Sequence, residues 1–162
     1  MRILCCLDGT NIAEISHALS TFLMTADART IGLLYVTDRG PHEDIGRVRT
    51  RHLRPHEMGK ARQDQMQQAD QYASQDILEE GVRNLPGSEA ITRQGRPERE
   101  IVNYAAEWNA DVIVICPRSS QSGHPSLGPK SVGHVARFVL DHAPCPVLLV
   151  RAITRTQFPL HK

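Results

Sequence analysis

The sequence predicts an α/β fold in which a parallel sheet is covered by helices on both faces. Short apolar runs alternate regularly with stretches of helical period, from a first strand to a fifth. The apolar runs show no polar alternation, which is typical of strands buried on both faces. The chain has 162 residues, the length of one domain.

The first half contains two expected strands and two expected helices. Arg2–Leu7 and Ile31–Val36 are predicted strands. Residues 11–26 are predicted to form a helix, because apolar residues recur there at intervals of three and four. Residues 38–57 break the pattern with Gly, Pro, Arg and His and are predicted to form a loop insertion. Residues 58–84 predict a long, largely solvated helix, whose thin apolar face is expected to contain Ala61, Ala69, Ala73 and Ile77.

The second half continues the alternation. Glu89–Gln94, Val112–Cys116 and Val147–Val150 are predicted strands. Pro97 suits the first position of a helix that runs to about Asn109, and Val132–His142 returns to helical spacing. We therefore expect one domain over residues 1–151, with a loop at 117–130 and a tail at 152–162.

Composition excludes several classes of protein. Nineteen Lys and Arg residues against 18 Asp and Glu residues leave a net charge of +1, so charge gives no argument for nucleic acid or an anionic membrane. The apolar runs are far shorter than the ~18 residues of a membrane span. The four cysteines form no CxxC pair, and three lie in apolar runs, which is typical of a reducing compartment. We expect a cytoplasmic protein.

Parallel sheets bind ligands beyond the carboxyl ends of their strands, which directs attention to the turns after Leu7, Val36 and Cys116. Asp8 follows the first strand, and its carboxylate could accept hydrogen bonds from a ribose or from the amine of a base. Gly9 lets the backbone turn with little bulk. The alternative interpretation is a ligand-free cap of the following helix, with Thr10 or Asn11 as the capping residue.

A second candidate segment leads from the fourth strand into the last helix. Small residues, hydroxyl groups, two cations and a helix start together favour an anion site. These residues are Arg118, Ser119, Ser120, Ser122, Gly123, Gly128, Lys130, Ser131 and Gly133. A solvated surface loop is the alternative, and the segment contains neither GxxxxGK[ST] nor GxGxxG.

Four segments in order resemble the universal stress protein family. They are Ile3-Leu4-Cys5-Cys6-Leu7-Asp8-Gly9-Thr10, Leu33-Leu34-Tyr35-Val36, Gly95-Arg96-Pro97 followed by Ala110-Asp111-Val112-Ile113-Val114, and His142-Ala143-Pro144-Cys145-Pro146-Val147-Leu148-Leu149-Val150-Arg151. The resemblance runs from Met1 to Arg151. It implies a Rossmann-like five-stranded parallel sheet of strand order 3-2-1-4-5, and a homodimer formed through the last strand, Val147–Val150.

The resemblance also implies where a nucleotide would bind. Members that bind ATP carry Gly-x-x-Gly, nine residues, then Gly-Ser/Thr. Here the final pair falls on Gly133-His134, and the opening pair falls on Cys116 and Ser119 or on Ser120 and Gly123, so the motif is degenerate. The expected nucleotide-binding residues are Cys6, Asp8, Gly9, Thr10, Val36, Cys116, Arg118, Ser119, Ser120, Gly123, Gly133, His134 and Val135.

Two functions stay open at this point. One is a stress-response regulatory protein that binds ATP or AMP, with Mg²⁺, and has no catalytic residue, weak ATP hydrolysis remaining open. The other is a member that binds no nucleotide and contacts protein partners through the arginine-rich segment Arg39–Arg62, which lacks the aromatic residues that would favour nucleic acid. His52 and His56 have a metal-ligand spacing, but Pro55 lies between them, and we expect no metal site.

Overall fold

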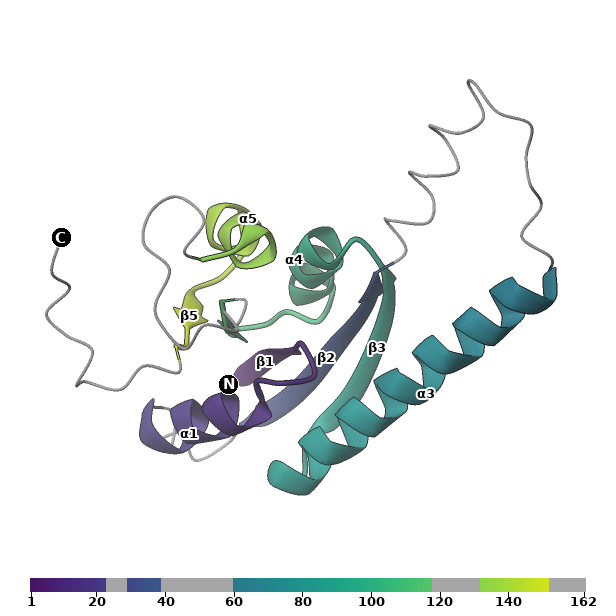
Figure 1. Cartoon of the computed structure of the whole chain (residues 1–162). Helices are drawn as coiled ribbons and strands as arrows, with labels where there is room; N and C mark the ends of the chain where they lie inside the picture. The colour runs from purple at the N-terminus through teal and green to yellow at the C-terminus, as the bar shows by residue number, and fades with distance from the viewer. Residues whose placement is uncertain (23–28, 39–59, 118–131, 152–162) are drawn as a thin grey trace, which may run out of the picture.

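Five parallel strands form one sheet in the order β3-β2-β1-β4-β5, which confirms the expected topology (Figure 1). The computed structural model describes residues 1–22, 29–38, 60–117 and 132–151. The strands are β1 (Arg2–Leu7), β2 (Thr30–Asp38), β3 (Glu89–Gly95), β4 (Val112–Ile115) and β5 (Val147–Leu149). The described helices are α1 (Ile12–Phe22), α3 (Lys60–Asn84), α4 (Pro97–Glu107) and α5 (His134–His142).

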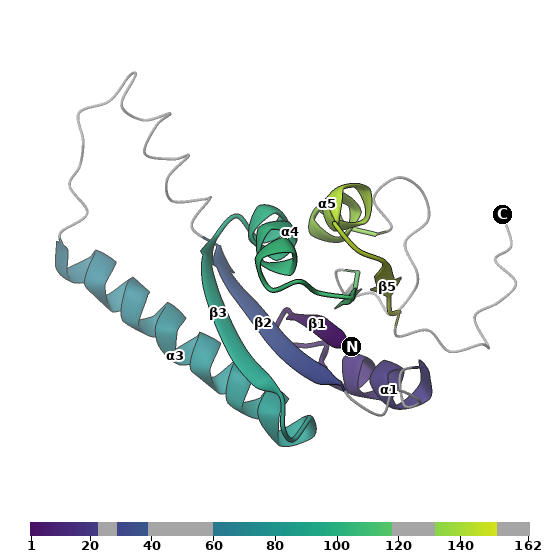
Figure 2. The ribbon, with the colours of Figure 1, turned by 180° about the vertical axis from the view of Figure 1, so that it is seen from behind.

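Helices cover both faces of the sheet, as the apolar runs predicted. α1 and α3 lie on one face, and α4 and α5 lie on the other (Figures 1 and 2). Each face has its own apolar core: Trp108 of the turn after α4 packs in one, and Ile15 of α1 packs in the other. Cys5 and Cys6 are adjacent in β1 and enter opposite cores, because successive side chains of a strand point to opposite faces.

β1 is the central strand of the sheet. It pairs with β2 on one edge, where Leu7 lies opposite Tyr35, and with β4 on the other, where Cys5 lies opposite Val114. Ile3, Leu4 and Cys5 have no exposed surface. A strand with both edges paired and both faces covered is accessible only at its two ends. Parallel sheets bind ligands beyond their carboxyl ends, so the turn after Leu7 is where β1 can meet a ligand.

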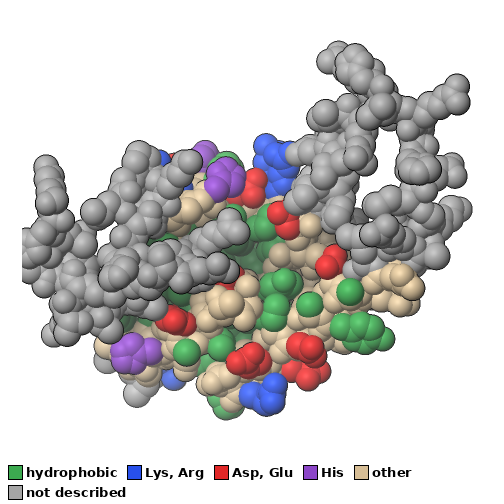
Figure 3. Space-filling model, in the orientation of Figure 1, with side chains coloured by type: hydrophobic (Ala, Val, Ile, Leu, Met, Phe, Trp, Pro, Cys, Tyr) green, Lys and Arg blue, Asp and Glu red, His purple; other side chains and the backbone are tan. Residues whose placement is uncertain are grey.

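The apolar face of α3 differs from the prediction. Ile77 is partly buried and packs against the core as predicted, whereas Ala69 and Ala73 are exposed. Ser74, Leu78 and Gly81 complete the buried side of the helix. The physical reason is the course of the helix: its carboxyl-terminal part lies against the sheet, and its amino-terminal part diverges from β2 and β3 (Figures 1 and 2). Acidic side chains line the exposed side of α3 (Figure 3); those described are Asp70, Asp76, Glu79 and Glu80.

Element boundaries also shift from those expected. β2 continues past Val36 to Asp38, because β3 pairs with it as far as Gly95. β4 ends at Ile115 and β5 at Leu149, each one residue earlier than predicted, and α5 begins at His134. The predicted loops at 38–57 and 117–130 lie almost wholly outside the described residues, as does the tail. No described helix is both long enough and apolar enough to cross a membrane.

Gly81 provides a test of this packing. A Cβ at this position would lie 2.9 Å from Leu33 Cδ1 and 3.1 Å from Leu7 Cδ1, between α3 and the sheet. We expect Gly81→Val to lower the free energy of unfolding by about 1–3 kcal/mol through overpacking, measured by urea denaturation. Glu80→Val, on the exposed side of the same turn, is the matched control and should change it by less than about 0.5 kcal/mol. Equal effects would contradict the assigned helix face.

Candidate functional site

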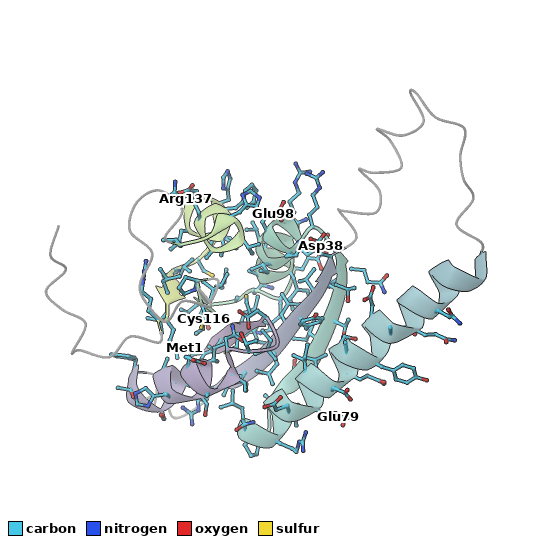
Figure 4. All side chains as sticks on the ribbon, in the orientation of Figure 1. Met1, Asp38, Glu79, Glu98, Cys116 and Arg137 are labelled. Carbon is cyan, nitrogen blue, oxygen red and sulfur yellow. The ribbon has the colours of Figure 1, made fainter. Side chains whose placement is uncertain are left out.

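The ends of β1, β2 and β4 meet at one edge of the sheet. Leu7 pairs with Tyr35, so Val36 lies level with Asp8, just past the last β1 residue. Cys5 pairs with Val114, so Cys116, two residues further along the chain and just past the end of β4, lies level with Leu7. Figure 4 labels Cys116 at the end of β4 and Asp38 at the end of β2. This geometry brings together the three turns that the sequence singled out.

Asn11 ties the start of α1 to the end of β1. Its side chain is 6% exposed, its Nδ2 donates to the carbonyl oxygen of Cys6 at 3.0 Å, and its Oδ1 accepts from the amide of Asp8 at 3.1 Å. Its backbone carbonyl accepts from the amide of Ile15 at 3.1 Å. The side chain of Asn11 therefore satisfies backbone groups of the β1 end, where the sheet ladder stops, rather than amides of the first helical turn as a simple cap would.

Asp8 is exposed and closes a tight turn with Thr10. Asp8 Oδ1 accepts from the Thr10 amide at 2.8 Å and from Thr10 Oγ1 at 3.0 Å. Asp8 Oδ2 has no hydrogen bond to the described residues, so it is the oxygen that a ligand can engage. Gly9 is required here because its φ is +89° and a Cβ would lie 3.1 Å from Ile77 Cδ1 of α3. Both interpretations of this turn, helix cap and ligand contact, fit one conformation.

Cys116 lies next to this turn and is held in the thiol form. Burial raises its pKa to about 12, with further contributions from the negative charges of Asp8 and Glu14, while a hydrogen bond with the side chain of Asn11 opposes the shift. Burial also raises the pKa of Cys5 to about 12 and that of Cys6 well above its usual range. These three cysteines are therefore poor nucleophiles and poor redox sensors.

Glu14 is a member of the site that the sequence analysis did not identify. It lies in the first turn of α1, and its Oε2 is buried without a hydrogen-bond partner in the described part of the chain. The signal available was the spacing Asn11-x-x-Glu14, which is that of a capping box. The Glu14 carboxylate adds to the negative charge of Asp8 and makes the α1 side of the edge acidic.

The start of α5 forms the other side of this edge. Gly133 precedes the helix with φ +84°, and no side chain caps its amide groups. His134 is the first helical residue; its side chain is 77% exposed, and its Nε2 lies 3.7 Å from Oε1 of Glu98, the second residue of α4. Glu98 is 8% exposed, and the sequence analysis did not identify it either, because nothing local marks a glutamate that will face another helix.

The other predicted site residues have varied positions. The thiol of Cys6 lies in the core under α4 and α5, and only the Cys6 carbonyl reaches the edge. Val36 is partly exposed and packs against that core. Val135 packs partly buried against the same core. Arg118, Ser119, Ser120 and Gly123 lie outside the described residues, as do His52 and His56. Within the described ranges, no three His, Cys, Asp or Glu side chains gather as metal ligands.

Comparison with known proteins finds a family model that matches most of the chain and relatives that match part of it. The model of the universal stress protein family matches residues 1–151. A universal stress protein of Thermus aquaticus is 39% identical over 67 residues, covering 41% of this chain and 46% of the relative. A universal stress protein of Methanothermobacter thermautotrophicus is 33% identical over 85 residues, covering 48% of this chain and 55% of the relative. The matched regions thus span about half the length of these relatives.

Solved structures share the fold at low sequence identity. Hypothetical protein MJ0577 aligns with TM-score 0.62 and 21% identity over 94% of this chain and 96% of its own. A universal stress protein in complex with cAMP aligns with TM-score 0.60 and 15% identity over 94% of this chain and 98% of its own. A universal stress protein family protein from Arabidopsis thaliana with AMP bound aligns with TM-score 0.60 and 18% identity over 98% of this chain and 95% of its own.

Thiol reactivity tests the environment assigned to Cys116. A pKa of about 12 in place of 9.0 lowers the thiolate fraction at pH 8 by about a thousandfold, because each unit of pKa lowers that fraction about tenfold. We expect iodoacetamide to modify Cys116 in the folded protein about a thousandfold more slowly than in the urea-unfolded chain, measured by peptide mass spectrometry. Equal rates in the two states would show that the thiol is neither buried nor beside Asp8 and Glu14.

Proposed function

The chain belongs to the universal stress protein family, and on this premise we propose that it binds an adenine nucleotide at the carboxyl edge of its sheet. The observation that carries the proposal is Asp8: an exposed carboxylate at the end of the central strand, with one oxygen fixed by Thr10 and the other available. Solved relatives with cAMP and AMP support the choice of an adenine nucleotide.

The base and ribose are assigned to the β1 side of the edge. Asp8 Oδ2 accepts a ribose hydroxyl or the exocyclic amine, and Gly9 and Thr10 shape the turn around it. Val36 provides apolar surface from β2, beyond the last pair with β1. Asn11 supports this half without contacting the ligand, because both polar ends of its side chain bind the backbone of β1 and its turn.

The phosphates are assigned to the segment between β4 and α5. Cys116 begins this segment, and Gly133, His134 and Val135 end it at a helix start, where free amide groups favour an anion. Arg118, Ser119, Ser120 and Gly123 are proposed to complete the phosphate contacts. Mg²⁺ would accompany ATP through the phosphate oxygens, and AMP would bind without it.

We propose that this is a cytoplasmic regulatory protein with a binding role and no catalytic residue. Residues 1–151 are proposed to form one domain. Reduced, unpaired cysteines at positions 5, 6, 116 and 145 support the compartment. A homodimer through Val147–Val150 is proposed because β5 is an edge strand that pairs only with β4 in the described sheet. Its side chains are partly exposed.

The competing proposal is a protein-partner role for the segment Arg39–Arg62. One observation favours it: the described side chains of α3 that follow this segment, Gln65 and residues 68–73, are exposed, so the helix offers surface there. Under this proposal adenine nucleotides would leave the unfolding temperature unchanged, whereas at about 100 times its dissociation constant a bound ligand stabilises the folded state by ~2.7 kcal/mol.

Asp8→Asn tests the proposed site with little disturbance of the turn, because the amide oxygen can still accept from Thr10. We expect this substitution to weaken binding of adenosine and AMP by about tenfold or more, through loss of a charge-assisted hydrogen bond, measured by isothermal titration calorimetry. Asp141→Asn, an exposed carboxylate in the last turn of α5, is the matched control and should leave affinity unchanged. Full affinity in Asp8→Asn would contradict the assignment.

A further inference from the structure

β3 is an edge strand of seven residues, and β2 is the one described strand that pairs with it. The register with β2 is unbroken, from Glu89 opposite Gly32 to Gly95 opposite Asp38. Sheet edges are commonly protected by proline, lysine or a bulge, and β3 has none of these. From Glu89 to Arg93, its outer edge therefore presents regular backbone donors and acceptors to another extended chain.

An apolar groove runs beside this edge, between α3 and β3. Leu78 and Val82 of α3 and Ala90 of β3 line it, and its volume is about 430 Å³. Ala90 and Thr92 point toward α3, because Ile91 between them packs against the core under α4 and side chains alternate along a strand. Both are exposed, since α3 diverges from β3 (Figures 1 and 2). Apolar surface thus lies open next to the strand edge.

The charged residues around the groove favour a basic partner. Arg83 lines the groove, and its Nε donates to the backbone carbonyl of Glu79 at 3.4 Å. Arg93, on the α4 side of the strand, pairs with Glu107 at 2.6 Å. Both arginines are engaged within the chain, whereas the carboxylates of Glu79 and Glu89 are exposed and form no ion pair with a described residue. A partner therefore meets a negative charge on each side of the sheet.

We propose that β3 and the groove bind an extended segment of a protein partner, in which apolar residues alternate with lysine or arginine. The segment adds a further strand beside β3, and the backbone of Glu89–Arg93 supplies hydrogen bonds to it. Its apolar side chains enter the groove, and its basic side chains lie on the opposite face, on the side of Glu89. Glu79 at the rim adds attraction. This binding does not depend on the nucleotide site at the ends of β1, β2 and β4.

Selection of a random linear peptide library on the immobilised protein tests this surface. We expect the enriched peptides to alternate apolar residues with lysine or arginine, and a synthetic copy to bind the native protein in fluorescence anisotropy. Ala90→Lys places a positive charge in the groove from an exposed position and should weaken that binding about tenfold or more. Ala106→Lys, at an exposed alanine of α4, is the matched control and should leave the affinity unchanged.

Two further measurements separate the charge from the strand pairing. Glu79→Lys should weaken binding of the selected peptide about fivefold or more, whereas Glu80→Lys, one residue further along α3 and outside the groove lining, should change it less than about twofold. Hydrogen–deuterium exchange should become slower at amides of Glu89–Arg93 when the peptide binds, because an added strand pairs with them. A helical peptide lying in the groove would leave these amides unchanged.

Several results would overturn the proposal. It is wrong if no peptide is enriched, if the enriched peptides lack the alternation, or if they bind the Ala90→Lys variant as tightly as the native protein. It is also wrong if the amides of Glu89–Arg93 gain no protection in the complex. Sedimentation equilibrium tests the remaining occupant: a native dimer that dissociates on Ala90→Lys would assign the groove to a second copy of this chain and not to a partner.

Discussion

The side chain of Asn11 is the contact on which the geometry of the candidate site depends. β1 is covered on both faces and paired on both edges, so its ladder must end where the chain turns toward α1. The carbonyl of Cys6 and the amide of Asp8 would be costly if buried without partners, by about 1–3 kcal/mol each. Asn11 satisfies both, and in doing so fixes the direction in which Asp8 leaves the strand.

The carboxyl edge of the sheet has two sides that differ in their charged groups. On the α1 side, Asp8 and Glu14 lie near Cys116 and help to hold its thiol protonated. On the α4 and α5 side, the buried carboxylate of Glu98 lies 3.7 Å from the exposed imidazole of His134.

The sequence predicted the elements well and their contacts less well. β1 and β4 were predictable because uniformly apolar runs signal burial on both faces, and the positions of Asp8 and Cys116 follow from those strand ends. The buried face of α3 was not predictable, because the angle at which the helix leaves the sheet decides which turns are buried. Leu78 and Gly81 therefore pack against the sheet, and Ala69 and Ala73 do not. The Glu98–His134 contact joins two helices that are distant along the chain, and no local pattern encodes it. The phosphate contacts predicted at Arg118, Ser119, Ser120 and Gly123 lie outside the described residues and stay a prediction.

The central claim is that the ends of β1 and β4 and the start of α5 border one ligand. Amide chemical-shift mapping of the ¹⁵N-labelled protein during titration with AMP tests it most directly. The account predicts that the shifts concentrate at Asp8–Asn11, Val36, Cys116 and Gly133–Val135. Shifts confined to the apolar groove between α3 and β3, a cavity of about 430 Å³ lined in part by Leu78, Val82 and Ala90, would contradict it.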